Sequence, residues 1–293
     1  MSMSNHPRLP LEVIEQIIDN VASKSRPLNR SHRVRKKFDD LPSVKTCALV
    51  CHSFLALSRK HIFDFVILDG RPISPTSDDL NHLLSNSPHL AVYIRKLVYY
   101  IPDKKEFVRK RLPWLTSMFK KLVKLQRLRI GYLPSGQTLD WMSPSARKLL
   151  LPLLHLSTLT AIKLFKFRNF ALADLAGCVN LKKLQIGYLQ CSTKVGKFLK
   201  ALPAAPVMLE ELAISPDNKD VAILHVERLC HARRPDGKPI FDLSSLKRFE
   251  ATVGLPDSLT ELFGMCTNLH KIHLTCMSLS RIPLLHPFDV SNS

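Results

Sequence analysis

The hydrophobic residues follow two different spacings along the chain, and the first predicts two short helices before about residue 60. Pro10 to about Val21 and Ser43 to about Arg59 carry apolar residues at the i, i+3, i+4 spacing of amphipathic helices. Pro10 suits the first position of a helix, because that position needs no backbone N–H donor. The apolar residues of the first segment cover roughly 160° of a helical wheel, wider than the ~100° stripe of an ordinary surface helix. This arc indicates packing on more than one neighbour.

The second segment forms one apolar stripe, from which Leu49 points away. Two short helices of about 45 residues in total bury too little surface to be securely stable alone. Their excess apolar surface is most simply explained by a protein partner or by docking on the rest of the chain.

After residue 78 the spacing changes to a loosely repeated nine-residue template of the form L-x-x-L-x-x-L-x-I. The copies are Leu122–Ile130, Leu156–Leu164, Cys178–Ile186, the shorter Leu209–Ile214, Leu243–Ala251, Cys266–Leu274 and a weaker one at Ile94–Tyr99. Each final apolar-x-apolar triplet predicts a strand with one buried face. Helix-like stretches separate the strands: Ser77–Leu84, Lys104–Leu122, Ser143–Leu154, Ser192–Leu202, Lys219–Ala232 and Asp257–Met265.

Strand and helix alternating every ~20–37 residues is typical of an irregular leucine-rich solenoid of about six to seven units, with a parallel sheet on its concave face. The fold class is therefore α/β. The alternative is a compact α/β domain with ordinary periodicity.

In a solenoid, the residues that alternate with the buried ones line the exposed wall of the sheet. These are Arg127, Arg129, Lys163, Lys183, Gln185, Glu211, Arg248, Glu250, Lys271 and His273. We take all of them except the two glutamates as candidate residues for binding a target. Between Arg95 and Arg129 twelve basic residues stand against two acidic ones. This charge should speed association with an acidic partner in a salt-dependent way.

The whole chain is basic, with 43 Lys and Arg against 24 Asp and Glu and a net charge of +19. Seven basic residues and no acid lie between Lys24 and Lys37. This segment has no hydrophobic period and predicts an exposed loop, in which Arg33–Lys37 could act as a nuclear import signal. Seven cysteines without a C-x-x-C pair indicate reduced thiols in the cytoplasm or nucleus. The sequence contains no run of ~18 apolar residues, so it predicts no membrane-spanning helix.

We find no catalytic, cofactor-binding or metal-binding pattern. The glycines do not form a nucleotide-binding loop, and no metalloprotease, hydrolase or kinase motif occurs. His225 and Cys230 lie about 140° apart on a helix and do not converge on a metal. Cys51 and His52 are adjacent and point about 100° apart, which excludes a nucleophile–base pair.

The first segments resemble the F-box. Leu9-Pro10-Leu11-Glu12-Val13-Ile14, followed by Leu49-Val50-Cys51-His52-Ser53-Phe54, is similar to the L-P-x-E helix and the second, V-C-containing helix of that module. A leucine-rich array behind an F-box is a common pairing, and basic chains of this layout resemble F-box proteins of mushroom-forming fungi. The resemblance implies an all-helical module over 1–68 with a basic insert at 24–40, a linker over 69–78 and the array over 79–293.

The resemblance also implies a function: substrate recognition in an SCF-type (Skp–cullin–F-box) ubiquitin ligase, with catalysis supplied by other subunits. The F-box would bind a Skp-type adaptor, and through it cullin, while the array would bind a target protein. The residues carried over to the adaptor surface are Leu9, Pro10, Leu11, Ile14, Ile17, Leu49, Val50, Cys51 and Phe54. Two alternatives remain: a repeat scaffold without cullin coupling, and a basic protein that binds nucleic acid or an anionic surface. The second is the weaker, because no aromatic stacking platform accompanies the charge.

Overall fold

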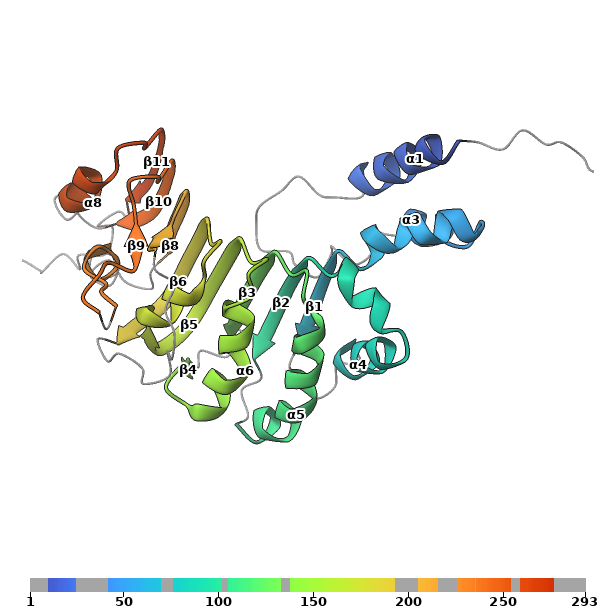
Figure 1. Ribbon diagram of the computed structural model, residues 1–293, viewed down its shortest axis with the longest axis horizontal. Coiled ribbons are helices and arrows are strands. Elements are labelled where there is room, and N and C mark those ends of the chain that lie inside the picture. The colour runs from blue at the N-terminus through green and yellow to red at the C-terminus, as the bar shows by residue number, and fades with distance from the viewer. Residues whose placement is uncertain are drawn as a thin grey trace, which may run out of the picture.

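The computed structural model describes nine stretches of the 293-residue chain. They are residues 10–24, 42–69, 76–101, 105–132, 138–192, 205–215, 226–234, 236–253 and 259–276. The described chain is mixed α/β and contains a nine-stranded, mostly parallel sheet (Figure 1). The predicted α/β class and parallel sheet are confirmed.

Eight strands of this sheet lie side by side in chain order, and all of them run parallel. They are β1 (Phe65–Asp69), β2 (Lys96–Ile101), β3 (Arg127–Tyr132), β5 (Ala161–Ala171), β6 (Lys183–Ser192), β8 (Glu211–Ser215), β10 (Arg248–Val253) and β11 (Lys271–Cys276). The short β4 (Leu139–Asp140) pairs with the far end of β5. A separate pair joins β7 (Val207–Met208) to β9 (Phe241–Asp242). All seven apolar-x-apolar triplets expected as strands are therefore strands.

The register of the sheet aligns the repeated apolar residues into continuous rows on one face. The central row runs through Leu97, Leu128, Ile162, Leu184, Leu212 and Phe249. Each of these six side chains is at most 2% exposed. We call this the packed face. Its continuity explains why the strands stack in chain order, because each unit buries the apolar side of the next.

Helices cover the packed face. They are α4 (Thr76–Asn86), η2 (Pro88–Tyr93), α5 (Lys105–Lys121), α6 (Pro144–Leu154), η3 (Leu172–Gly177) and α8 (Thr260–Met265). Figure 1 shows α4, α5 and α6 together on one side of the sheet. Leu115, Met118, Leu150 and Leu154 from α5 and α6 join the strand residues in one core. A further helical turn spans 226–230. The helices predicted around 77–84, 104–122 and 143–154 are confirmed, whereas most of 192–202 lies outside the described residues.

Three helices precede the sheet: α1 (Leu11–Lys24), α2 (Pro42–Cys47) and α3 (His52–Ile62). We call α1, α2 and α3 the helical module. The prediction of one helix over Ser43–Arg59 is wrong, because a turn at 48–50 divides it and Cys51 is extended, with φ −164° and ψ 173°. Val50 and Cys51 favour helix only weakly, and no burial compensates for this, since both are exposed.

The module joins the sheet without a break. Strand β1 starts at Phe65, inside the range 1–68 expected for the F-box-like module, and pairs with β2. Helix α4 starts at Thr76, within the expected linker 69–78. The predicted basic insert lies almost entirely outside the described residues, as does the end of the chain after Cys276.

Strands β5 and β6 continue beyond the predicted triplets through left-handed backbone positions. Lys166, Asn169 and Tyr188 have φ angles of 61°, 55° and 55°. The first and third follow Phe165 and Gly187, which are paired across the two strands. Each such residue interrupts the in–out alternation of the strand, so that Phe167 and Leu189 turn back into the core.

Candidate functional site

The helical module exposes most of the residues expected to bind an adaptor. Leu49 is 86% exposed, Val50 65%, Leu11 55% and Ile17 39%. Pro10 and Cys51 are also exposed. Phe54 is half-buried, whereas Ile14 is buried within the module, and Leu9 lies outside the described residues. The wide apolar arc of α1 is thus divided: one edge is buried and the other faces solvent.

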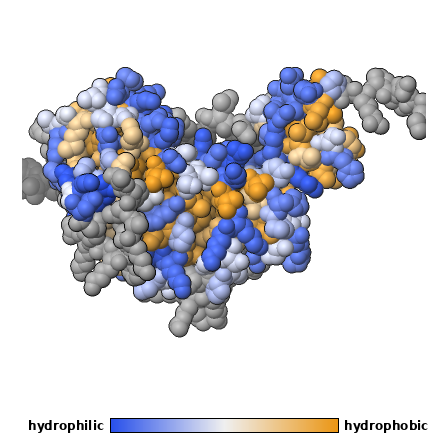
Figure 2. Space-filling model, in the orientation of Figure 1, coloured by the Kyte–Doolittle hydropathy of each residue, from blue (hydrophilic) through white to orange (hydrophobic). Residues whose placement is uncertain are grey.

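The buried edge of α1 holds the module together. Ile18, Ala22 and Val44 are at most 2% exposed, and α1 contacts both α2 and α3. Within the described chain, this small core leaves Leu11 and Ile17 of α1 exposed, together with Leu49 and Val50 of the 48–50 turn. Hydrophobic side chains are visible at this end of the molecule in Figure 2, bordered by polar ones.

A cluster of charges fastens α3 to α1. Lys60 Nζ lies 2.6 Å from Glu15 Oε1 and 3.1 Å from Asp19 Oδ1, and His61 Nε2 lies 2.7 Å from the same Asp19 oxygen. Slight burial would raise the pKa of Asp19, but the hydrogen bonds from Lys60 and His61 outweigh it and lower the pKa. The charged cluster lies between the two helices and adds modestly to the contact between α1 and α3.

The second candidate surface is the face of the sheet opposite the packed one, which we call the open face. One row across it runs from Lys96 through Arg127, Ala161, Lys183, Glu211 and Arg248 to Lys271. The next row runs from Val98 through Arg129, Lys163, Gln185, Ala213 and Glu250 to His273. The register therefore brings all eight predicted target-binding residues into two neighbouring rows. Arg127, Lys163, Lys183, Lys271 and His273 are exposed, and the other three are half-buried.

Charge is distributed unevenly along these rows. On strands β6 to β11, the two rows contain carboxylates as well as cations. Lys183 Nζ lies 2.5 Å from Glu211 Oε1, and Arg248 lies 3.5 Å from Glu250. In the β2–β5 part, the two rows carry only cations among their charged residues. Lys96 is paired with Asp64 from outside the rows, at 2.5 Å. Within the described chain, neither Arg127 nor Arg129 forms an ion pair with a carboxylate.

Arg129 lies against an aromatic ring on the open face. Its guanidinium carbon is 5.0 Å from the centre of the Phe165 ring, within the range of a cation–π contact. The Nε atom of Arg129 is buried and has no hydrogen-bond partner among the described residues. The ring lies over Gly187, where a Cβ atom would come within 2.4 Å of Phe165 Cδ1. At Gly131, on the other side, a Cβ would lie 3.3 Å from Phe165 Cβ.

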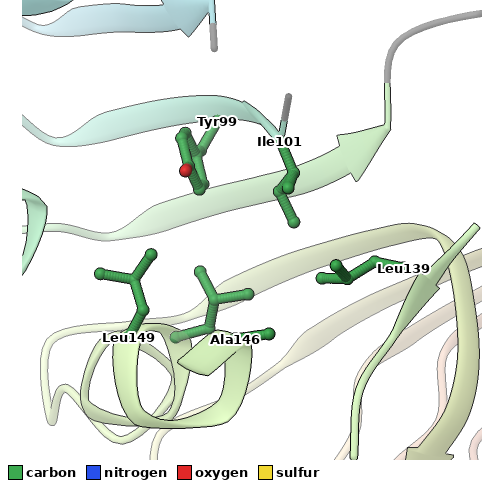
Figure 3. A pocket seen from close by; sticks show the side chains of 6 residues that line it. Tyr99, Ile101, Leu139, Ala146 and Leu149 are labelled. Carbon is green, nitrogen blue, oxygen red and sulfur yellow. The ribbon is translucent and has the colours of Figure 1, made fainter. Parts of the chain in front are cut away.

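A small crevice between β2, β4 and α6 offers no chemistry. Its lining residues are Tyr99, Ile101, Leu139, Ala146, Leu149 and Leu150. Figure 3 shows their side chains converging from the strands and the helix. Apart from the tyrosine hydroxyl, these side chains are apolar. The crevice is therefore a gap in the core rather than a candidate active site.

The described residues contain no group of three or more His, Cys, Asp or Glu that could hold a metal ion. Cys230 is buried, and burial raises its pKa to about 11, while His225 lies outside the described chain. None of the described helices is both long and apolar enough to span a membrane.

Sequence reasoning missed Phe165, Gly131 and Gly187. The chain has only 9 glycines, and two of them fall at equivalent positions of the repeats on either side of β5, two residues beyond the open-face residues Arg129 and Gln185. Glycine inside a strand often marks a close approach by another group. That signal could have pointed to the ring between them.

Neither a scan against protein-family models nor a search of the curated proteins finds a match for this chain.

Proposed function

We propose that the chain is the target-binding subunit of an SCF-type ubiquitin ligase, working in the cytoplasm or nucleus. In this proposal the helical module is an F-box that binds a Skp-type adaptor, and the sheet belongs to a leucine-rich array that binds the target. The observation that carries the proposal is the exposure of Leu49 and Val50, at 86% and 65%, within the motif that resembles the F-box.

Large apolar side chains at this exposure are costly to leave in water. Burying one such side chain contributes about 1.5–3 kcal/mol. Leu49 and Val50 add nothing of this kind to the module, since its core is formed by other residues. A protein surface that covers them would gain this free energy on binding.

The open face supports the second half of the proposal. Two rows of mostly polar side chains cross parallel strands on the side opposite the helices, and the described helices leave five of their charged members exposed. A broad, charged surface on a rigid sheet is suited to binding a folded or extended protein segment.

The test is capture of a purified Skp-type adaptor by the full chain. The variant Leu49→Asp/Val50→Asp should fold normally, with the free energy of unfolding changed by no more than about 0.5 kcal/mol, because both side chains are exposed. Its affinity for the adaptor should fall at least a hundredfold, because two carboxylates would be buried in an apolar interface. Circular dichroism and urea unfolding check the fold.

The control is Val179→Asp, which places a single carboxylate on a valine that is 49% exposed in the turn before β6. It should bind the adaptor like the unmodified chain. Equal capture by the double variant and the control would overturn the proposal. Capture of the adaptor without cullin would favour a repeat scaffold instead.

A further inference from the structure

Arg129 is held in place before any partner binds. Its guanidinium lies over the Phe165 ring. The ring in turn lies over Gly187 of β6, where any Cβ atom would overlap it. Gly187 thus lies under the ring, and Gly131 lies beside the Cβ atom of Phe165. An arginine with few conformations to lose binds an anion at a lower entropic cost than a free one.

The arginine also has an unsatisfied donor. A buried guanidinium N–H without an acceptor loses its bond to water, which carries a free-energy penalty. The Nε–H itself is shielded, but the arginine as a whole is only half-buried, so a bound carboxylate next to the ring would meet the accessible part of the guanidinium and bring an acceptor and a negative charge together. Aromatic and arginine side chains are also the types enriched at the energetic centres of protein interfaces.

The spacing of the cations suits an extended peptide. Arg127 and Arg129 are two residues apart on β3, so they are about 6.6 Å apart along the strand. Every second side chain of an extended peptide has the same spacing. A peptide lying along β3 would therefore place two acidic residues on the arginines and its next side chain beside Phe165.

We propose that the β2–β5 part of the open face binds an extended acidic segment of the target. Arg127 and Arg129 hold two of its carboxylates, and the Phe165 ring packs against an apolar side chain that follows them. This proposal rests on the proposed function, since it assumes that the open face receives the target, and it adds the chemistry of that target. The β6–β11 part, where carboxylates already neutralise cations, is the weaker site for such a segment.

The probe is a fluorescent peptide containing Glu-Ser-Glu-Ser-Leu, made in both chain directions, with binding to the full chain followed by anisotropy. We expect it to bind at least tenfold more tightly than Gln-Ser-Gln-Ser-Leu, and less tightly as salt rises, because salt screens exposed charges. A single-stranded oligonucleotide of equal charge should bind more weakly than the peptide.

Three variants separate the contributions. Arg129→Gln should weaken peptide binding at least tenfold, whereas Lys45→Gln, the same loss of charge on an exposed residue of α2, should leave it unchanged. Gly187→Ala displaces the Phe165 ring and removes no charge, since its Cβ would overlap the ring. It should weaken binding severalfold, and Phe165→Leu should partly preserve it.

Equal affinity of the acidic and amide peptides, or of Arg129→Gln and Lys45→Gln, would overturn the inference, and so would tighter binding of the oligonucleotide. Adaptor capture by Arg129→Gln is measured in parallel. If the adaptor is captured but the acidic peptide is not preferred, only this inference fails. If the acidic peptide is preferred but the adaptor is never captured, the inference stands and the ubiquitin-ligase proposal fails.

Discussion

The helical module and the sheet differ in where they keep their hydrophobic residues. In the module, Ile18 and Val44 are fully buried, while Leu11, Leu49 and Val50 stay more than half exposed. In the sheet, the central row of the packed face is buried without interruption from Leu97 on β2 to Phe249 on β10. From β2 to β10 the sheet thus buries its central apolar row, and exposed apolar residues of that face appear only on β11, at Ile272 and Leu274, among the described strands; the module leaves a larger share of its apolar residues exposed.

This difference predicts that stability and binding can be changed separately within one chain. Substitutions in the sheet core should change the free energy of unfolding of the whole sheet. Substitutions at the exposed residues of the module should change binding and leave folding intact.

The largest effect should come from a buried ion pair that supports β5. Asp174 in η3 is fully buried, pairs with Arg147 of α6, and accepts a hydrogen bond of 2.7 Å from Trp141 Nε1. Asp174→Ala should lower the free energy of unfolding by about 3–5 kcal/mol, because the arginine charge would stay buried without the Asp174 carboxylate. Urea unfolding followed by circular dichroism measures this loss.

A second readout comes from Cys178, which lies after η3. Burial, with a smaller contribution from Asp174, raises the pKa of its thiol to about 12. The thiol should therefore be alkylated at neutral pH only when the sheet unfolds. The control is Asp174→Leu/Arg147→Met, which removes both charges and should recover part of the lost stability, since the buried Trp141 N–H still loses its acceptor. If Asp174→Ala costs less than about 1 kcal/mol, the pair does not support the sheet as we describe.

The next effect should be confined to the module. Ile18 is fully buried between the helices, and Ile18→Ala should cost about 2–5 kcal/mol through lost contacts and a cavity. Hydrogen exchange should then accelerate in α1, α2 and α3 and stay unchanged in β3, β5 and β6. Faster exchange throughout the sheet would mean that the two regions unfold as one unit.

The sequence predicted the sheet well because its signal is local. An apolar-x-apolar triplet marks a strand wherever one face is buried, and all seven triplets are strands. The prediction failed where the backbone leaves the regular pattern. Positive φ angles at Lys166 and Asn169 reverse the alternation, so the second half of β5 shows no period of two. The helix expected over Ser43–Arg59 is divided by the exposed turn at 48–50. Hydrophobic periodicity does not show which helical turns would lack packing contacts with the rest of the protein.

The candidate surfaces were predicted unevenly for the same reason. Alternation along the strand correctly predicted that Arg129 lies on the open face, because the face that a residue occupies depends only on its position along its own strand. Phe165, Gly187 and the pair formed by Asp174 and Arg147 depend on residues far apart in the sequence, and a single sequence does not show these contacts. Ile14 illustrates the reverse: its place in the motif suggested the adaptor surface, but packing within the module buries it.

The smallest effect tests the ion pairs between α1 and α3. Lys60→Met should weaken the module by about 0.2–1 kcal/mol, because Lys60 and its partners Glu15 and Asp19 are all a third to a half exposed and water screens them. The pKa of Asp19 is lowered in the folded module, so its contribution is present at neutral pH. That contribution disappears as the pH falls through and below the ordinary aspartate range near 3.8.

The stability of the module should therefore differ between the unmodified chain and Lys60→Met at neutral pH. The two values should converge in acid, where Asp19 is protonated in both proteins. Amide signals of α1 in NMR spectra, recorded along a pH titration, report the folded fraction of the module. A difference that persists unchanged in acid would contradict the assignment to Asp19. Glu210 provides the comparison in the sheet: hydrogen bonds from Lys182 and Lys247 lower its pKa. Lys182→Met should leave the folded fraction of the sheet unchanged over the same titration, because the continuous packed face far outweighs one exposed ion pair.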